Sequence, residues 1–139
     1  MAMRTVYLGL GSNLGNRRAI LTETIAKINE SIGAVLRQSS FYETAPWGFD
    51  SPNTFLNACI CITTDLEPLQ LLAATQRIER EMGRNHKTID GQYQDRIIDI
   101  DILLIDNLRI NEPRLTVPHP LMEQREFVMV PLKEILLKA

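Results

Sequence analysis

Hydrophobic and polar positions along the chain follow two different periods. Apolar runs or strict alternation, which are typical of β-strands, occupy residues 6–10, 34–42, 56–64 and 95–105. In the third of these segments we expect one face of a sheet to carry Ala58, Ile60 and Ile62, and the other to carry Asn57, Cys59, Cys61 and Thr63. The two cysteines share a face and cannot easily bond with each other, so we interpret them as small buried residues.

Two further segments repeat apolar residues every three or four positions, as one face of a helix does. The stripes are Leu21, Ile25, Ile28 and Ile32 in the first segment, and Leu71, Thr75, Ile78 and Met82 in the second. Helix boundaries are indicated by Asn16 and Pro68 at the starts and by Gly33 and Gly83 at the ends. The order strand, helix, strand, strand, helix, strand predicts an α+β fold with a ferredoxin-like βαββαβ core, in which two helices cover one face of an antiparallel sheet.

The last predicted strand carries two aspartates in its most apolar stretch. Side chains alternate along a strand, so Asp99 and Asp101 would share one face, about 7 Å apart by strand rise. The opposite face would carry Ile98, Ile100, Ile102 and Leu104. Buried carboxylates need a partner, and Mg²⁺ carried by a nucleotide fits, because it usually takes one or two protein carboxylates together with phosphates. An ion-pair network with arginines is the structural alternative.

Residues 84–96, directly before this strand, are locally basic through Arg84, His86, Lys87 and Arg96. Cations beside metal-binding carboxylates are the combination that a Mg-nucleotide requires, because the cations meet the phosphates and the aspartates meet the metal. A solvated charged loop is the alternative interpretation.

Three other segments leave alternatives open. Residues 43–53 are long for a hairpin loop and contain Trp47, which either belongs to a lid over a flat ligand or fills the edge of the core. The spacing of Gly9, Gly11 and Gly15 departs from a dinucleotide fingerprint, so residues 11–16 are interpreted as an ordinary turn-rich loop. His119 stands between two prolines and is either a phosphate contact or a structural residue, and residues 121–127 look like a short helical turn.

Composition narrows the classes of function. With 139 residues, 45% hydrophobic and 23% charged, the chain fits a single globular domain over residues 1–139. A net charge of -2 argues against nucleic acid as the main ligand. The sequence shows neither a run of 18 apolar residues nor a signal-peptide pattern, so we expect a cytoplasmic protein that does not bind membranes.

A series of short motifs, taken in order along nearly the whole chain, resembles one known family. The motifs are Gly11-Ser12-Asn13-Leu14-Gly15, Ser40-Phe41-Tyr42-Glu43-Thr44, Phe55-Leu56-Asn57-Ala58, Thr75-Gln76-Arg77-Ile78-Glu79, Gly83-Arg84, Arg96-Ile97-Ile98-Asp99-Ile100-Asp101-Ile102-Leu103 and Leu115-Thr116-Val117-Pro118-His119-Pro120. They resemble the 6-hydroxymethyl-7,8-dihydropterin pyrophosphokinases of the folate pathway. The resemblance implies transfer of diphosphate from ATP to the pterin hydroxymethyl group, with release of AMP and with two Mg²⁺ ions, by an in-line route without a covalent intermediate. We expect a monomer.

Carried over by position, the resemblance also assigns roles to single residues. Asp99 and Asp101 would hold the metal ions, and Arg84 and Arg96 would complete the catalytic set. The ATP-binding residues would be Gln76, Glu79, Arg84, His86, Lys87, Arg96, Ile100, Arg114, Thr116, His119 and Arg125. The pterin-binding residues would be Thr44, Ala45, Pro46, Trp47, Phe55, Asn57, Tyr93, Asp99 and Phe127, with Phe55 and Phe127 on either side of the ring.

Two other functions compete with this one. A non-catalytic ferredoxin-like module would bind a small ligand or a protein, because this fold hosts many functions, but it would have no reason to keep Asp99 and Asp101 on a buried strand. A different Mg-dependent, nucleotide-using transferase would keep the aspartates but would not need Phe55 and Phe127, which suit a flat bicyclic substrate. The sequence also departs from the family pattern, with Phe55 where tyrosine is common and His86 where a second loop arginine is common.

Overall fold

The computed structural model describes residues 3–45, 53–83 and 97–136. Its helices and strands follow one another in the order β1 (Arg4–Ser12), α1 (Arg17–Ser31), β2 (Ala34–Gln38), β3 (Tyr42–Thr44), β4 (Phe55–Thr64), α2 (Pro68–Glu81), β5 (Asp99–Ile105), β6 (Ile110–Glu112), β7 (Leu115–Val117), the 3-10 turn η1 (Met122–Gln124) and α3 (Glu126–Leu136). None of the helices within these ranges is long and apolar enough to span a membrane.

The main sheet has the strand order β2-β4-β1-β5, and β3 continues along β4 as a further short partner. The pairs β1–β4, β1–β5, β2–β4 and β3–β4 are all antiparallel. With α1 between β1 and β2, and α2 between β4 and β5, this confirms the predicted α+β class and the ferredoxin-like βαββαβ order.

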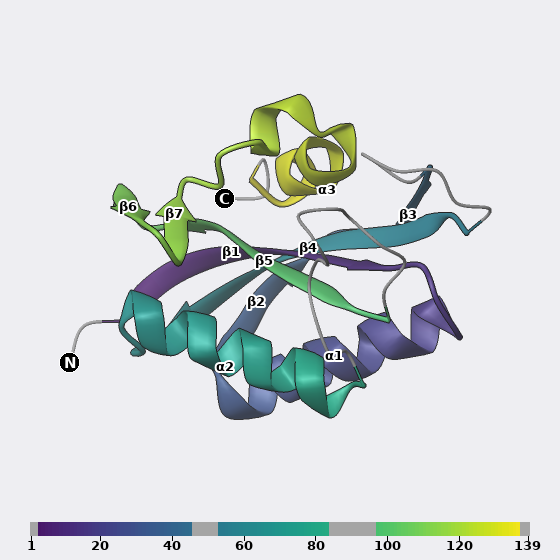
Figure 1. The fold of residues 1–139 in the computed structure, drawn as a ribbon, viewed down its shortest axis with the longest axis horizontal. Coiled ribbons are helices and arrows are strands. Elements are labelled where there is room, and N and C mark those ends of the chain that lie inside the picture. Colours follow the sequence, from purple (N-terminus) through teal and green to yellow (C-terminus); the bar gives the residue numbers. More distant parts are fainter. Residues whose placement is uncertain (1–2, 46–52, 84–96, 137–139) are drawn as a thin grey trace.

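The sheet separates two hydrophobic layers. Helices α1 and α2 cover one face and α3 covers the other (Figure 1). The larger layer joins the predicted helical stripes, such as Leu21 and Ile78, to strand residues such as Ile60 and Ile100. The smaller layer packs residues of α3 and η1 against Cys59, Cys61 and Leu103. The sequence analysis predicted the first layer but did not assign a helix to residues 126–136.

The helix boundaries follow the local chemistry. Asn16 accepts a hydrogen bond at Oδ1 from the N–H of Ala19 at 3.2 Å, which is the predicted N-cap of α1. Pro68 is the first residue of α2, where its missing N–H does no harm. Gly83 follows α2 with a φ of +101°, a conformation that favours glycine.

Three predicted strand boundaries differ from the structure. Residues 34–42 form two strands instead of one, because the Ser39 hydroxyl accepts the hydrogen bond from the Cys59 N–H at 2.9 Å and so replaces a backbone acceptor between β2 and β3. Gly11 and Ser12 belong to β1 rather than to a loop, since both pair with β4. In the last predicted strand, β5 begins at Asp99, and residues 95–96 lie outside the described ranges.

A bulge changes which face the end of β5 presents. Leu8 pairs with Ile102 and Tyr7 pairs with Leu104, so Leu103 is an extra residue on β5. Leu103 and Leu104 both join the α3 layer, and Ile105 returns to the layer of α1 and α2. The prediction that Leu104 shares a face with Ile98, Ile100 and Ile102 is therefore wrong, because strict alternation assumes a strand without a bulge.

Two further strands follow β5, where none was predicted from the sequence. β6 and β7 pair as a short antiparallel hairpin, with Asn111 opposite Thr116. The predicted helical turn within residues 121–127 is confirmed as η1.

Candidate active site

Two rows of residues cross the neighbouring strands β4, β1 and β5 on the face that α3 covers. The register places Asn57, Gly11 and Asp99 side by side in one row, and Cys59, Gly9 and Asp101 side by side in the next. The middle residue of each row is a glycine, so β1 presents only backbone between the side chains of β4 and β5.

Gly11 is the more restrictive of the two glycines. A Cβ at Gly11 would lie 2.9 Å from Asn57 Oδ1 and 3.5 Å from the Phe55 ring. A Cβ at Gly9 would make an ordinary contact of 3.4 Å with the Leu103 side chain. From the sequence, the glycine spacing was judged to depart from a dinucleotide fingerprint, and Gly11 was placed in a turn-rich loop. Two glycines at alternate positions of an apolar strand could have indicated this site, since they mark a close approach on one sheet face.

Asp99 and Asp101 are both half-buried and share the α3 face, as predicted. His119 lies beside them, with Nε2 4.0 Å from Asp101 Oδ1. The backbone N–H of Leu121 donates to His119 Nδ1 at 3.5 Å, an arrangement in which Nε2 is the nitrogen that faces the aspartate. The structure thus supplies a carboxylate partner for His119 that the sequence alone did not reveal.

Glu79 reaches the same strand from its other face. Its side chain is 3% exposed, and Oε2 accepts a hydrogen bond from the backbone N–H of Ile100 at 2.8 Å. Ile100 stands between the two aspartates, so the Glu79 carboxylate holds the backbone at that point. Gln76, one helical turn earlier on α2, is half-buried. The predicted ATP-binding residues of α2 therefore lie on the helix side of the sheet, opposite the aspartate side chains.

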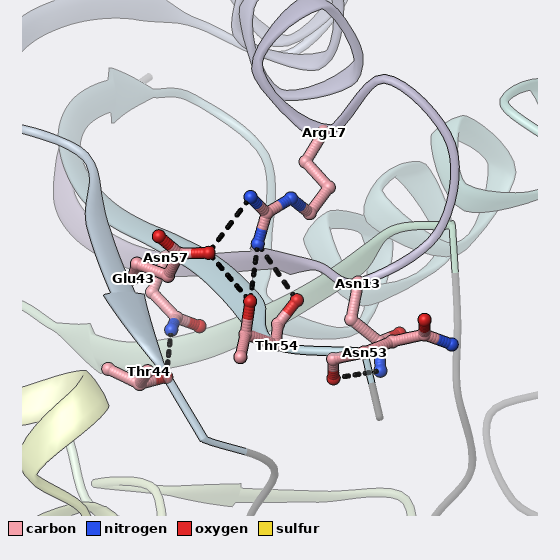
Figure 2. A network of polar contacts seen from close by, with 7 residues as sticks. All are labelled: Asn13, Arg17, Glu43, Thr44, Asn53, Thr54 and Asn57. Carbon is pink, nitrogen blue, oxygen red and sulfur yellow. Dashed lines mark hydrogen bonds and ion pairs between the residues drawn. The ribbon is translucent and has the colours of Figure 1, made fainter. Parts of the chain in front are cut away.

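The residues predicted to contact the pterin begin at the junction of β3 and β4. Thr44 pairs with Phe55 in the sheet, and Asn57 Nδ2 donates to Thr44 Oγ1 at 2.6 Å (Figure 2). Asn57 is 3% exposed and Phe55 is 8% exposed, so both side chains are fixed by packing. Ala45 follows directly and is exposed.

Arg125 and Phe127 lie at the start of α3. The Arg125 guanidinium carbon is 5.6 Å from the centroid of the Phe127 ring, within the range of a cation–π contact. Arg125 is buried and Phe127 is half-buried. This contact restricts the orientation of the ring on the face of the sheet that also carries the two aspartates.

The negative charge of Asp101 affects the pKa of Cys59, which lies in the same row. Burial, and to a smaller degree the negative charge of Asp101, raise the pKa of the Cys59 thiol to about 12. The thiol therefore stays protonated at neutral pH, and its Sγ lies 3.8 Å from the Val128 carbonyl oxygen, to which it donates. Cys59 is a packing residue, as predicted, and not an activated nucleophile.

The other predicted residues are dispersed or lie outside the described ranges. Arg114 is exposed in the turn between β6 and β7, and Thr116 is half-buried on β7. The predicted residues that the structure does not describe are Pro46, Trp47, Arg84, His86, Lys87, Tyr93 and Arg96. Within residues 3–45, 53–83 and 97–136, no group of three or more histidine, cysteine, aspartate or glutamate side chains could hold a metal ion.

The sheet order, the helices on both faces and the aspartate pair define a ferredoxin-like α+β protein with a two-carboxylate site. Residues 7–137 match the family described as 7,8-dihydro-6-hydroxymethylpterin-pyrophosphokinase, or HPPK. The chain therefore belongs to the HPPK family and is an enzyme of the pyrophosphokinase type, which confirms the resemblance inferred from its motifs.

Individual relatives agree with this assignment. The 2-amino-4-hydroxy-6-hydroxymethyldihydropteridine pyrophosphokinase of Porphyromonas gingivalis strain W83 is 48% identical over 134 residues, which are 96% of this chain and 91% of the relative. Its counterpart in Bacillus subtilis is 42% identical over 130 residues, 93% of this chain and 76% of the relative. Among solved structures, an HPPK-DHPS in complex with substrates is similar with a TM-score of 0.78 at 15% identity; the match covers 98% of this chain and 40% of that one.

Proposed function

We propose that the protein transfers the diphosphate group of ATP to the hydroxymethyl group of 6-hydroxymethyl-7,8-dihydropterin, with release of AMP, as a step of folate synthesis. The observation that carries the proposal is the row of Asn57, Gly11 and Asp99. Asn57 supplies an amide that can pair with the polar edge of a pterin, Gly11 leaves room beside it because it has no side chain, and Asp99 supplies a carboxylate for the metal. Neighbouring strands are about 4.8 Å apart, so β4 and β5 lie about 10 Å apart, which suits a flat bicyclic ring.

In this proposal the aspartate pair would hold two Mg²⁺ ions together with ATP. The donor set fits: both side chains are half-buried carboxylates on one face of β5, and Mg²⁺ is usually bound by one or two carboxylates together with phosphate oxygens and water. Bound Mg²⁺ would neutralise charge on the ATP phosphates. His119 Nε2, close to Asp101, would donate to a phosphate oxygen.

The remaining residues of the chain would hold the two substrates in line. Phe55 and Phe127 would stack on the pterin, while Asn57 and Thr44 would bind its polar edge. Gln76, Glu79, Arg114, Thr116 and Arg125 would lie along ATP, and Arg84 and Arg96, which are outside the described residues, would stabilise charge on the phosphates.

In the transfer itself, the hydroxymethyl oxygen forms a bond to the β-phosphorus as the bond between that phosphorus and the oxygen retained by AMP breaks, and the hydroxyl proton is released to solvent. Such a reaction needs positioning and charge neutralisation rather than a protein nucleophile. The neutral, buried thiol of Cys59 supports a route without a covalent intermediate. We further propose that the protein acts as a cytoplasmic monomer.

The test separates the two halves of the site. Asp101→Asn should fold normally, bind 6-hydroxymethylpterin as the wild type does, and lose most turnover, because it removes a proposed metal-binding charge and leaves the proposed pterin contacts in place. Asn57→Ala should instead weaken pterin binding. Turnover within a few-fold of wild type in Asp101→Asn and in Asp99→Asn would refute the metal role. If the wild type forms no AMP from ATP and the pterin, the binding module is favoured instead.

A further inference from the structure

A polar network lies on the α1 side of the strands that carry Thr44 and Asn57 (Figure 2). Arg17, in the first turn of α1, donates from Nη1 to the Thr54 carbonyl oxygen at 2.9 Å and to Thr54 Oγ1 at 3.0 Å. Its Nη2 lies 3.0 Å from Glu43 Oε2, and the Thr54 hydroxyl donates to the same carboxylate oxygen at 2.6 Å. Three segments far apart in the sequence therefore meet at one cluster, here called the rear clamp: Arg17, Glu43 and Thr54.

The rear clamp and the proposed pterin contacts occupy opposite faces of the same strand pair. Thr44 pairs with Phe55, and each of these residues directly follows a member of the clamp, Glu43 or Thr54. Because side chains alternate along extended chain, Glu43 and Thr54 face α1 while Thr44 and Phe55 face the substrate side. A displacement of the clamp would thus move the backbone that carries the proposed contacts.

Strand β3 contains only three residues and pairs with β4, and at its first residue the Tyr42 hydroxyl donates to Glu134 of α3 at 2.6 Å. A pairing this short contributes little stability by itself. Yet the 2.6 Å hydrogen bond from Asn57 to Thr44 requires β3 to lie at a fixed distance from β4. A second tether acts nearby, since Asn13 Nδ2 donates to the Asn53 carbonyl oxygen at 3.4 Å.

Charge also favours the contact between Arg17 and Glu43 in the rear clamp. Hydrogen bonding from Thr54 and the neighbouring Arg17 lower the pKa of Glu43, which keeps the carboxylate ionised at neutral pH. The side chains of Arg17 and Glu43 are 28% and 58% exposed, so their ion pair contributes little to global stability. Its effect should therefore fall on the local position of β3 rather than on folding.

We propose that Arg17, Glu43 and Thr54 are positioning residues, which hold β3 against β4 from behind and so fix Thr44 and Asn57 for the pterin. This inference rests on the proposed function. Glu43 belongs to one of the sequence motifs, but its partners Arg17 and Thr54 do not, and these two residues are 37 positions apart.

The experiment compares the steady-state constants of matched variants, with AMP formation as the signal. Thr54→Val keeps the branched shape of threonine but removes the hydroxyl, whereas Thr54→Ser keeps the hydroxyl. Thr54→Val and Arg17→Ala should raise the KM for 6-hydroxymethyl-7,8-dihydropterin about three- to tenfold, as expected for loss of a partly exposed polar network, with the KM for ATP and kcat unchanged. Thr54→Ser should stay near the wild type.

A second ion pair provides a control for general effects of losing a surface charge. Arg4 and Glu67 also approach to 3.0 Å between Arg4 Nη2 and Glu67 Oε2, but they link β1 to the residue before α2. Arg4→Ala should leave both KM values unchanged.

The outcomes separate the clamp from the function on which it rests. If Arg17→Ala and Thr54→Val leave the pterin KM unchanged while Asn57→Ala raises it, the clamp is refuted and the proposed function stands. An equal rise of both KM values would also refute it, because the site would then be loosened as a whole. If the wild type forms no AMP with the pterin, the proposed function fails and the inference fails with it. Circular dichroism checks that each variant is folded, and Arg17→Ala, at a half-buried position in the first turn of α1, tests the proposal if Thr54→Val does not fold.

Discussion

Replacing Gly11 by alanine should weaken binding of the pterin without unfolding the protein. The added Cβ would lie 2.9 Å from Asn57 Oδ1, which is several tenths of an ångström closer than carbon and oxygen normally approach. Asn57 cannot yield freely, because its side chain is 3% exposed and its Nδ2 is bonded to Thr44 at 2.6 Å. The Phe55 ring, 3.5 Å from the new atom, closes the other direction.

The size of the effect follows from these contacts. Overpacking of one methyl group in a rigid site costs about 1–3 kcal/mol. Loss of the hydrogen bond between Asn57 and Thr44 would add about 1 kcal/mol. If about 1.4 kcal/mol of this cost is lost from the free energy of pterin binding, the affinity for the pterin decreases about tenfold. Part of the remainder should appear as a lower free energy of unfolding.

The assay is a fluorescence titration with 6-hydroxymethylpterin in the presence of Mg²⁺ and a non-hydrolysable ATP analogue. Gly9→Ala is the matched control, because its Cβ would meet the flexible Leu103 side chain at an ordinary 3.4 Å. We expect weaker pterin binding for Gly11→Ala and near wild-type binding for Gly9→Ala, with urea unfolding showing both proteins folded. Unchanged pterin affinity in Gly11→Ala would show that the row of Asn57, Gly11 and Asp99 does not form the substrate floor.

Three further predictions concern single side chains. Glu79→Ala should lower the free energy of unfolding in urea by about 2 kcal/mol, because it leaves the buried N–H of Ile100 without its side-chain acceptor. Glu79→Gln should recover most of this loss, and equal losses in both variants would contradict the hydrogen-bond role. Burial raises the pKa of Cys59 to about 12, so in a Cys61→Ala background this thiol should react with Ellman's reagent at pH 8 only after urea unfolds the protein. Labelling of the folded protein at the rate of a free thiol would be inconsistent with the burial of Cys59. The hydrogen bond to Glu134 raises the pKa of Tyr42 above its ordinary value of 10. This tyrosine therefore contributes stability below pH 10 that is lost as the pH rises through its folded-state pKa. The alkaline decrease in the free energy of unfolding should be smaller in Tyr42→Phe, and an identical decrease would argue against the bond.

Local patterns were sufficient to predict most of the sheet and both helices that cover its first face. The stripe of Leu21, Ile25 and Ile28 is buried as its spacing indicated, and Asn57 and Cys59 lie on the same side of β4. Predictions failed where a contact between distant segments overrides the local period. The hydroxyl of Ser39 interrupts a strand by bonding to Cys59, and the bulge at Leu103 reverses a face of β5.

The same distinction applies to the candidate site. The spacing of Asp99 and Asp101 was enough to place both carboxylates on one face, because that depends on one strand alone. Other features of the site depend on how separate strands and helices meet. These are the contact between His119 and Asp101, the hydrogen bond from Ile100 to Glu79, and the close approach of Gly11 to Asn57. Register of this kind is fixed by packing across the sheet and has no signature in a short stretch of sequence.

Analysis of the products most directly tests whether this site catalyses diphosphate transfer. The protein would be mixed with ATP, Mg²⁺ and 6-hydroxymethyl-7,8-dihydropterin, and the nucleotides and phosphate esters followed by chromatography and phosphorus NMR, with Asp101→Asn in parallel. We expect AMP and pterin diphosphate to form in equal amounts with the wild type and to be nearly absent with the variant. ADP with a pterin monophosphate, or AMP formed equally fast by Asp101→Asn, would contradict diphosphate transfer at the aspartate pair.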